Sequence, residues 1–342
     1  MPHNDAFKRL GLLVSAHLLS TSAKADLESV ILHHVIDDVV YTRDLRNSTA
    51  RTYPTLEGSD LHVEHTQGSA ISLTPSGGWP GLSSELTPIN LLSKTGVVHQ
   101  LSDIFIPRSV HLTVGKLAKA AKGTTMTNLI IKAGMEWVLN GTTPPADSPW
   151  GQNGISGTGW TLLCPSDDAF KEVNLTQLHA DKAAMQLLVG QHLLNTPKSA
   201  EFPGSPTNQP VRFDDEDIYE SLISPESSYR DVVFRGRENG QVTVGIKNSP
   251  GTGGKVDWAK VTAWGRATTG GGTGGVIQID RLLVPYEPPL WLEYGPPMTV
   301  AIFGVLAIGG FFMGVRKIWR LDRTEATYEP VGGFGREDDD ES

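Results

Sequence analysis

The sequence has little cysteine: Cys164 is the single one among 342 residues. No intrachain disulfide can form, so the folded part must be held together by buried apolar side chains rather than by cross-links. Cys164 ends the apolar run Trp160–Cys164. This setting predicts a buried, inert thiol and not a nucleophile.

The sequence also lacks the residue spacings of common catalytic and metal sites. The loop Ser249–Val256 resembles a phosphate-binding loop, but Ser249 replaces its first glycine and Val256 replaces its magnesium-binding hydroxyl. The acidic run Asp214–Asp217 lacks the glycine and spaced oxygens of a calcium loop. No zinc-binding pattern is found among His33, His34, His62, His65, His99 and His111. We therefore predict that the chain is not an enzyme and has no cofactor and no metal.

An excess of positive charge is absent as well. The chain has 29 Lys and Arg against 38 Asp and Glu, a net charge of −9, which argues against nucleic-acid binding. The hydrophobic fraction of 39% and the charged fraction of 20% are typical of globular packing and exclude disorder of the whole chain. The length predicts two domains.

One long apolar run is present near the C-terminus. Met298–Val315 contains no charged side chain, and at about 1.5 Å per helical residue it covers a hydrocarbon core of roughly 30 Å. Trp291 and Tyr294 precede it and Trp319 follows, as at membrane interfaces. The basic cluster Arg316–Arg320 predicts a cytoplasmic C-terminal side. We therefore expect a single-pass type I membrane protein with a lumenal or extracellular ectodomain, a Pro-rich linker at 288–297, a membrane helix at 298–315 and a tail at 316–342.

Two alternatives to a membrane span are less consistent with the residues. A buried core helix rarely has such an uninterrupted run with Trp and basic flanks. A lipid-anchor signal would end in its hydrophobic tail, whereas the polar segment Leu321–Ser342 follows here. Candidate glycosylation sites at Asn47, Asn140 and Asn174 all precede the apolar run, in agreement with the predicted topology.

Three motifs occur twice in the same order, which indicates an internal repeat. Pro2–Lys8 matches Pro165–Lys171, Val30–Ile36 matches Leu188–Leu194, and Gly96–Pro107 matches Gly275–Pro285. Two homologous domains, at 1–108 and 113–287, are the simplest explanation.

The first two motifs resemble the sequence boxes of the fasciclin-type domain, a Pro-x-Asp-x-Ala-Phe turn after a strand and an apolar stretch around a His. The resemblance implies an α+β fold of two fasciclin-like domains, with small mixed or antiparallel sheets packed against helices. We expect the box histidines to be core residues, hydrogen-bonded to nearby backbone or to the turn. The matching family residues are Pro2, Asp5, Phe7, His34, Pro165, Asp168, Phe170 and His192.

The two units differ in what precedes the first motif. The second has a helical region at Leu112–Leu139, where Leu129, Ile130, Ala133 and Trp137 recur at helical spacing. The first has no counterpart, because Met1 coincides with the end of its first-box strand, and the polar opening Met1–Phe7 is no signal peptide. We expect the first domain to be incomplete at its N-terminus, with a signal peptide in the missing part.

The resemblance implies a non-enzymatic role at a membrane surface, in adhesion or in binding a protein, a glycan or a second copy of the chain. Animal adhesion members often have Tyr before the second-box His; His33 and Gln191 stand there, so an integrin-type contact is not expected. Similarity in layout to fungal vacuolar or endomembrane members offers an alternative role in trafficking or autophagosome–vacuole fusion, and favours that location over the plasma membrane. Tyr328–Val331 fits a Tyr-x-x-apolar adaptor-binding motif; a solvated tail without sorting function is the other interpretation.

Overall fold

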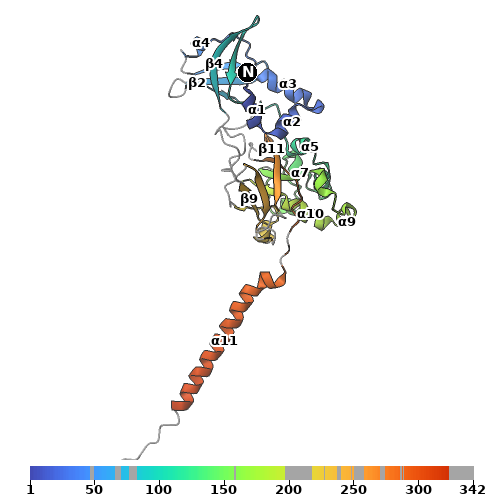
Figure 1. Ribbon diagram of the computed structural model, residues 1–342, viewed down its shortest axis with the longest axis vertical. Coiled ribbons are helices and arrows are strands. Elements are labelled where there is room, and N and C mark those ends of the chain that lie inside the picture. Colours follow the sequence, from blue (N-terminus) through green and yellow to red (C-terminus); the bar gives the residue numbers. More distant parts are fainter. Residues whose placement is uncertain are drawn as a thin grey trace, which may run out of the picture. The chain divides into compact units, whose positions relative to one another are not determined.

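The computed structural model describes residues 1–46, 50–65, 71–76, 83–157, 159–196, 218–226, 228–236, 240–247, 249, 258–269, 274–285, 287 and 289–322 (Figure 1). The chain divides into two compact units, Met1–Tyr286 and Glu287–Ser342. Each is described by itself.

The first repeat begins with helices and continues as an antiparallel sheet. The helices are α1 (Asn4–Leu10), α2 (Leu12–Leu18), a 3-10 turn η1 (Thr21–Ala23), α3 (Lys24–His33) and α4 (Thr42–Arg46). The strands β1 (Ala50–Pro54), β2 (Asp60–His65), β3 (Ile71–Pro75), β4 (Ser84–Leu92) and β5 (Val97–Leu101) pair in chain order. Leu61, Val63, Ile71 and Leu73 alternate with more exposed residues, so one face of this sheet is apolar.

The second repeat has more elements around a larger sheet. Its helices are α5 (Val114–Ala120), α6 (Thr124–Lys132), α7 (Glu136–Asn140), α8 (Pro149–Gln152), α9 (Leu175–Ala180) and α10 (Lys182–Gln191), with 3-10 turns η2 (Asp167–Phe170), η3 (Ser224–Glu226) and η4 (Ser228–Arg230). Its strands are β6 (Trp160–Pro165), β7 (Leu193–Asn195), β8 (Ile218–Tyr219), β9 (Val232–Gly236), β10 (Val242–Ile246), β11 (Ala259–Arg266) and β12 (Gly275–Ile279), and their order across the sheet is β7-β6-β12-β11-β10-β9-β8.

The two sheets are built alike. Read outward from the last strand, β12-β11-β10-β9-β8 repeats the antiparallel order β5-β4-β3-β2-β1. Pro165 pairs in parallel with Ile279, and Pro2 makes the equivalent parallel bridge to Leu101. A second pair of bridges, Ile36 to Thr55 and Leu194 to Ser221, is also equivalent. The predicted α+β class is confirmed, and the repeat seen in the sequence is a repeat of the fold.

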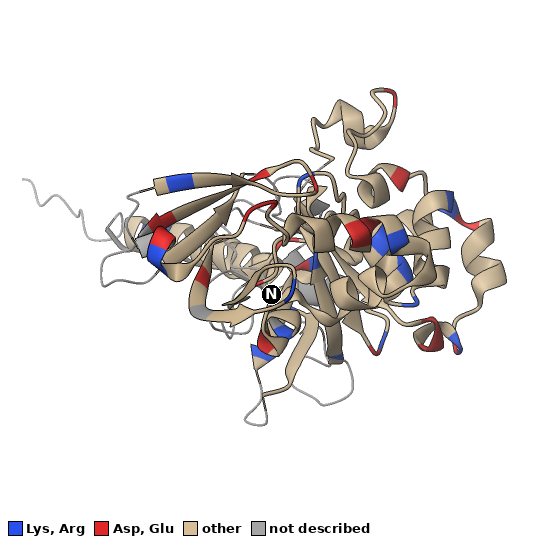
Figure 2. Cartoon of the chain, turned by 90° about the horizontal axis from the view of Figure 1, so that it is seen from above, with Lys and Arg blue, Asp and Glu red and all other residues tan. Residues whose placement is uncertain are grey.

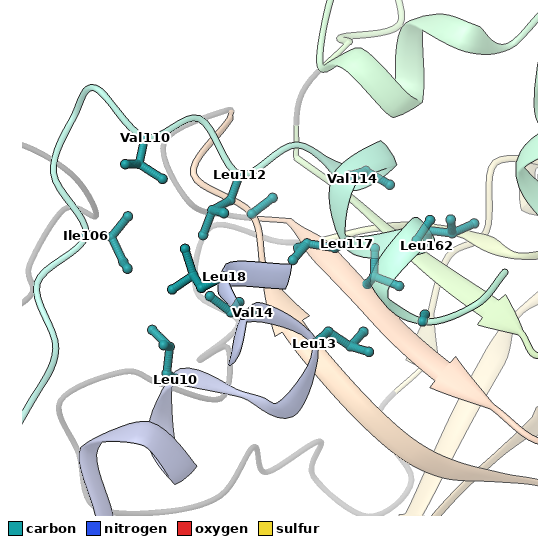
Figure 3. Close-up of a cluster of buried hydrophobic side chains, with 14 of the residues drawn as sticks. Leu10, Leu13, Val14, Leu18, Ile106, Val110, Leu112, Val114, Leu117 and Leu162 are labelled. Atoms are coloured by element: carbon teal, nitrogen blue, oxygen red, sulfur yellow. The ribbon is translucent and has the colours of Figure 1, made fainter. Parts of the chain in front are cut away.

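The two repeats share a continuous core. Helix α2 packs on α5 and on β11, and apolar side chains of both repeats meet there (Figure 3). The backbone approaches closely at two glycines: a Cβ added at Gly11 would lie 2.7 Å from the Trp264 ring, and one at Gly265 would lie 2.9 Å from the Leu13 Cβ. This inter-repeat seam explains why Met1–Tyr286 is one compact unit; the division near residues 108–113 stays a prediction.

The second unit contains one long helix, α11 (Leu290–Asp322), of 33 residues. Within it Pro297–Arg320 has a mean hydropathy of 2.2 and is long and apolar enough to cross a membrane. The helix extends further in both directions than the apolar run 298–315 and includes most of the predicted linker. Pro296 and Pro297 lie inside this helix, although proline in a helix interior removes a backbone hydrogen bond and usually kinks or ends the helix.

Candidate functional site

Each repeat holds one histidine with both ring nitrogens bonded to the main chain. In the first repeat, the N–H of Phe105 donates to His34 Nε2 at 3.1 Å, and His34 Nδ1 lies 2.6 Å from the Val30 carbonyl. In the second, the N–H of Leu283 donates to His192 Nε2 at 3.0 Å, and Nδ1 lies 2.8 Å from the Leu188 carbonyl. Because Nε2 accepts, the proton is on Nδ1, which donates to the carbonyl.

Burial lowers the pKa of both His34 and His192 to about 4. Both rings are therefore neutral near pH 7, and neither nitrogen is left for a proton transfer or a metal ion. Each histidine ties the end of a helix, α3 or α10, to the segment that follows the last strand of its repeat. Main-chain groups, and not the turn of the first box, satisfy both rings.

The first-box turn of the second repeat is packed on both sides. All six residues of β6 are buried, and Phe170 in η2 is 3% exposed. The Ser166 side chain makes no capping bond to this turn. Instead Asp167 Oδ1 accepts the N–H of Thr125 at 2.7 Å, at the start of α6. This carboxylate thus holds helix α6 against the turn, while Asp168 pairs with Lys171 at the surface.

The first-box turn of the first repeat is less covered. The N–H of His3 donates to the Leu101 carbonyl at 2.9 Å, as that of Ser166 does to Ile279 at 3.1 Å. Asp5 pairs with Lys8 at 2.7 Å, as Asp168 pairs with Lys171. Phe7, however, is 50% exposed.

His33 and Gln191, which precede the box histidines, are both fully buried. Burial lowers the pKa of His33, although Glu57 beside it opposes this shift; His33 Nδ1 lies 2.8 Å from the Ser59 hydroxyl oxygen. The Gln191 amide donates to the Arg230 carbonyl at 2.9 Å. Neither side chain is available to a partner at the surface.

Groups with reactive chemistry are isolated. Cys164 is fully buried, and burial raises the pKa of its thiol to about 12. Within the described residues no group of three or more His, Cys, Asp and Glu could hold a metal ion. Figure 2 shows Lys and Arg interspersed with Asp and Glu along the described part of the chain.

Two of the three predicted glycosylation sites lie on exposed helix ends. Asn140 is exposed at the end of α7, before Gly141 with φ +67°. Asn174 is exposed at the start of α9, and its Oδ1 accepts the N–H of Gln177 at 3.1 Å. Asn47 and the tail residues Tyr328 and Val331 lie outside the described residues.

A cavity of about 570 Å³ lies in the first repeat, between helices α1 to α3 and the apolar face of the sheet. The sequence motifs gave no sign of it, because residues far apart in the chain line it. They include Phe7, Leu27, Ile31, Tyr53, Leu73 and His99.

Comparison with known protein families gives a match for part of the chain. The family model for the fasciclin domain matches residues 1–107. Among solved structures, a FAS1 domain pair from the insect cell adhesion molecule fasciclin I is similar at 14% identity and a TM-score of 0.28, covering 82% of this chain and 86% of that one. No curated protein matches.

Proposed function

Because residues 1–107 are a fasciclin domain, we propose that this chain is a single-pass membrane glycoprotein whose paired fasciclin-like repeats bind a protein, a glycan or a second copy at a membrane surface. The observation that carries the proposal is the family match, since fasciclin domains are associated with adhesion. The apolar helix within Pro297–Arg320 supplies the anchor.

The geometry supports a binding module over an enzyme. The two histidines that the sequence repeats are neutral and bonded to main chain, so they stabilise each repeat instead of acting on a substrate. The continuous core between the repeats would present them to a partner as one rigid surface. The exposed Asn140 and Asn174 suit a glycosylated, lumenal or extracellular surface.

The test uses the full chain reconstituted through α11 into fluorescent liposomes. We expect these liposomes to cluster with each other, or to bind immobilised glycans or matrix proteins, above the level of protein-free liposomes. Removing the ectodomain with protease after reconstitution is the control and should abolish the binding. The proposed binding function is wrong if liposomes that carry the intact chain neither cluster nor bind any glycan or matrix protein above the level of protein-free liposomes.

A second candidate function is trafficking at a vacuolar or endosomal membrane, favoured by the Tyr328–Val331 motif and the acidic cluster Glu337–Glu341. An adaptor would read Tyr328 in an extended tail. Tyr328→Ala should then move the protein to the cell surface, with Tyr294→Ala as a tyrosine control outside the motif. An unchanged distribution of Tyr328→Ala would contradict this candidate.

A further inference from the structure

Two neighbouring histidines at the end of α3 contact the connection between the repeats. His34 does so directly, because its Nε2 accepts the N–H of Phe105 at 3.1 Å. His33 does so through two side chains of the turn that joins β1 to β2. Its Nδ1 lies 2.8 Å from the Ser59 hydroxyl oxygen, and that hydroxyl donates to Glu57 Oε2 at 2.5 Å.

The carboxylate of Glu57 completes this chain of hydrogen bonds. Its other oxygen, Oε1, accepts the hydroxyl of Ser109 at 2.5 Å. Ser109 lies in the connection from β5 to α5, and Ile106 and Val110 on either side of it belong to the continuous core of the two repeats (Figure 3). The first repeat is thus bonded to the connection through four residues, here called the junction cluster: His33, Ser59, Glu57 and Ser109.

The hydrogen bonds determine which nitrogen of His33 carries the proton. Because the Ser59 hydroxyl donates to the Glu57 carboxylate, it accepts from the ring, so Nδ1 is protonated. Nε2 then has a lone pair, and it has no hydrogen-bond partner within the described part of the chain. The ring is fully buried, and the Glu57 side chain is 10% exposed. A second proton on the ring would therefore sit on a buried nitrogen with no acceptor beside it.

The titratable groups that face the His33 ring oppose each other. Glu57, from the turn, lies 3.5 Å from Nδ1 and favours a charged ring. His34, on the same helix, has its ring centroid 6.3 Å away and opposes a charged ring when it is itself protonated. Phe105, from the connection, is apolar, with its ring centroid also 6.3 Å away. Burial lowers the pKa of His33 and outweighs the opposing effect of Glu57.

Main-chain hydrogen bonds define the equivalent positions in the second repeat. Two bonds recur, Leu56 to Val35 as Leu222 to Leu193, and Ser76 to Asp60 as Lys247 to Asp231. Glu57 and Ile223 directly follow the donors of the first pair of bonds, so they are equivalent. Ser59 and Arg230 directly precede the acceptors of the second pair, so they are equivalent too.

The second repeat fills these positions without a titratable pair. The equivalents of His33 and Glu57 are Gln191 and Ile223, both buried. The Gln191 amide donates to the Arg230 carbonyl at 2.9 Å and so keeps the contact between helix and turn. Its Oε1 has no partner among the described residues, as Nε2 of His33 has none. The fold therefore needs a polar contact at this place but not an ionisable one.

We propose that the junction cluster is an acid-sensitive latch of the first repeat, closed near pH 7 and opened when His33 takes up a second proton. A charged ring needs water or a new acceptor for its Nε2–H, which it reaches only when the end of α3 and the turn separate. This separation breaks the contact with Ser59 and frees the Glu57 carboxylate from Ser109. The inference goes beyond the proposed function, because it concerns the connection between the repeats and holds whatever their surface binds.

The direction of the pH dependence follows from the lowered pKa of His33. The closed state binds fewer protons than the open state, in which the ring regains its ordinary pKa of about 6.5. The closed state is therefore fully favoured above that pH and progressively less favoured below it. For a ring that stays neutral while closed, the population of the open state increases by up to about eightfold between pH 7 and pH 5.5.

The test is amide hydrogen exchange of the full chain in detergent at pH 7 and pH 5.5, corrected for the intrinsic pH dependence of exchange. The N–H groups of Leu56, Gly58 and Val110 report on the turn and the connection, since each is hydrogen-bonded in the closed state. We expect their exchange to be several-fold faster at pH 5.5. His33→Gln, which copies Gln191 and keeps His34, should remove most of this increase.

Two further variants separate the latch from a general effect of acid. His62→Gln is the matched control, because His62 is exposed on β2 and should leave the increase unchanged. Ser109→Ala removes the bond from Glu57 to the connection at an exposed position. Exchange at Val110 should then already be faster at pH 7, while Leu56 keeps its increase at pH 5.5.

Three results would overturn the proposal. The first is equal corrected exchange of Leu56, Gly58 and Val110 at the two pH values. The second is an increase that His33→Gln leaves unchanged, which would assign it to His34. The third is unchanged exchange of Val110 at pH 7 in Ser109→Ala, which would show that the junction cluster does not hold the connection.

Discussion

His34 and His192 are equivalent residues that make the same two hydrogen bonds, one from a backbone N–H to Nε2 and one from Nδ1 to the carbonyl four residues earlier. In each repeat the ring joins a helix to the chain beyond the last strand. The sequence repeat therefore places the same stabilising histidine contact in both halves of the ectodomain. The effects of mutation and of acid predicted below depend on this contact.

Removing the second of these rings should destabilise the ectodomain. His192→Ala leaves the buried N–H of Leu283 and the carbonyl of Leu188 without partners and opens space in the core, so we expect a loss of about 3 kcal/mol. Urea unfolding of the full chain in detergent measures it. His62→Ala is the control, because His62 is exposed on β2 and, among the described residues, its ring bonds only the Thr52 hydroxyl. Equal losses in both variants would contradict the assignment.

Acid should weaken the same contacts. The folded-state pKa of His34 and His192 is about 4, below the ordinary value of about 6.5, so the unfolded chain binds more protons between these values. The free energy of unfolding that each neutral ring contributes is fully present above about pH 6.5 and is lost as the pH falls toward 4. At pH 5 the loss is about 2 kcal/mol per ring.

Unfolding free energies measured at pH 7 and pH 5 test this window. Burial raises the pKa of Asp26 and Glu57, but their hydrogen bonds outweigh it, so the pKa of each carboxylate lies below its ordinary value. The stability that these two carboxylates contribute is therefore lost only at lower pH, below those ordinary values. His192→Gln should reduce the difference between pH 7 and pH 5 by about 2 kcal/mol, the contribution of its own ring, while His34 and His33, whose pKa values are also lowered by burial, account for the rest. A difference that His192→Gln leaves unchanged would contradict the role of this ring.

The sequence predicted the features that local pattern determines. The apolar run predicted a membrane-length helix from its length and composition alone. The α+β fold was implied by the resemblance of the repeated boxes around His34 and His192 to the fasciclin-type domain. The helix start at Leu290 was not predicted, since Pro296 and Pro297 favour a linker when read locally.

Features that depend on contacts distant in the chain could not be predicted. Gly11 meets Trp264 and Gly265 meets Leu13, and a single sequence contains no signal that pairs such positions. The exposure of Phe7 is of the same kind. Its motif matches that of Phe170, but burial depends on a covering helix that the motif does not encode.

The inter-repeat seam gives a further expectation. Gly265→Ala places a Cβ 2.9 Å from that of Leu13, and overpacking of this kind costs about 1–3 kcal/mol. Because the core is shared, hydrogen exchange should accelerate in both α2 and α5. Gly96→Ala is the matched control, with nothing within 4 Å of the added Cβ. Acceleration confined to one repeat would show that the two fold independently.

An ionic contact also crosses between the repeats. Asp26 of α3 accepts from Lys116 Nζ of α5 at 2.8 Å and lies 2.9 Å from His17 Nε2. Asp26→Asn should lower stability by about 1 kcal/mol, because the pair is only partly shielded from water. Asp168→Asn, which breaks a surface pair within one repeat, should leave the urea midpoint unchanged. Equal midpoints for the two variants would show that the Asp26 contact contributes nothing.

Glycosylation tests the topology. With the full chain expressed in eukaryotic cells and detected through its tail, N-glycosidase should increase gel mobility, because Asn140 and Asn174 are exposed. Asn140→Gln should remove one step of the shift. At the other site Thr176→Ala is preferable to Asn174→Gln, because it destroys the sequon and keeps the Asn174 side chain that caps α9. If neither variant nor the glycosidase changes the mobility, the sequons at Asn140 and Asn174 are unused, and the orientation inferred from Arg316–Arg320 loses their support.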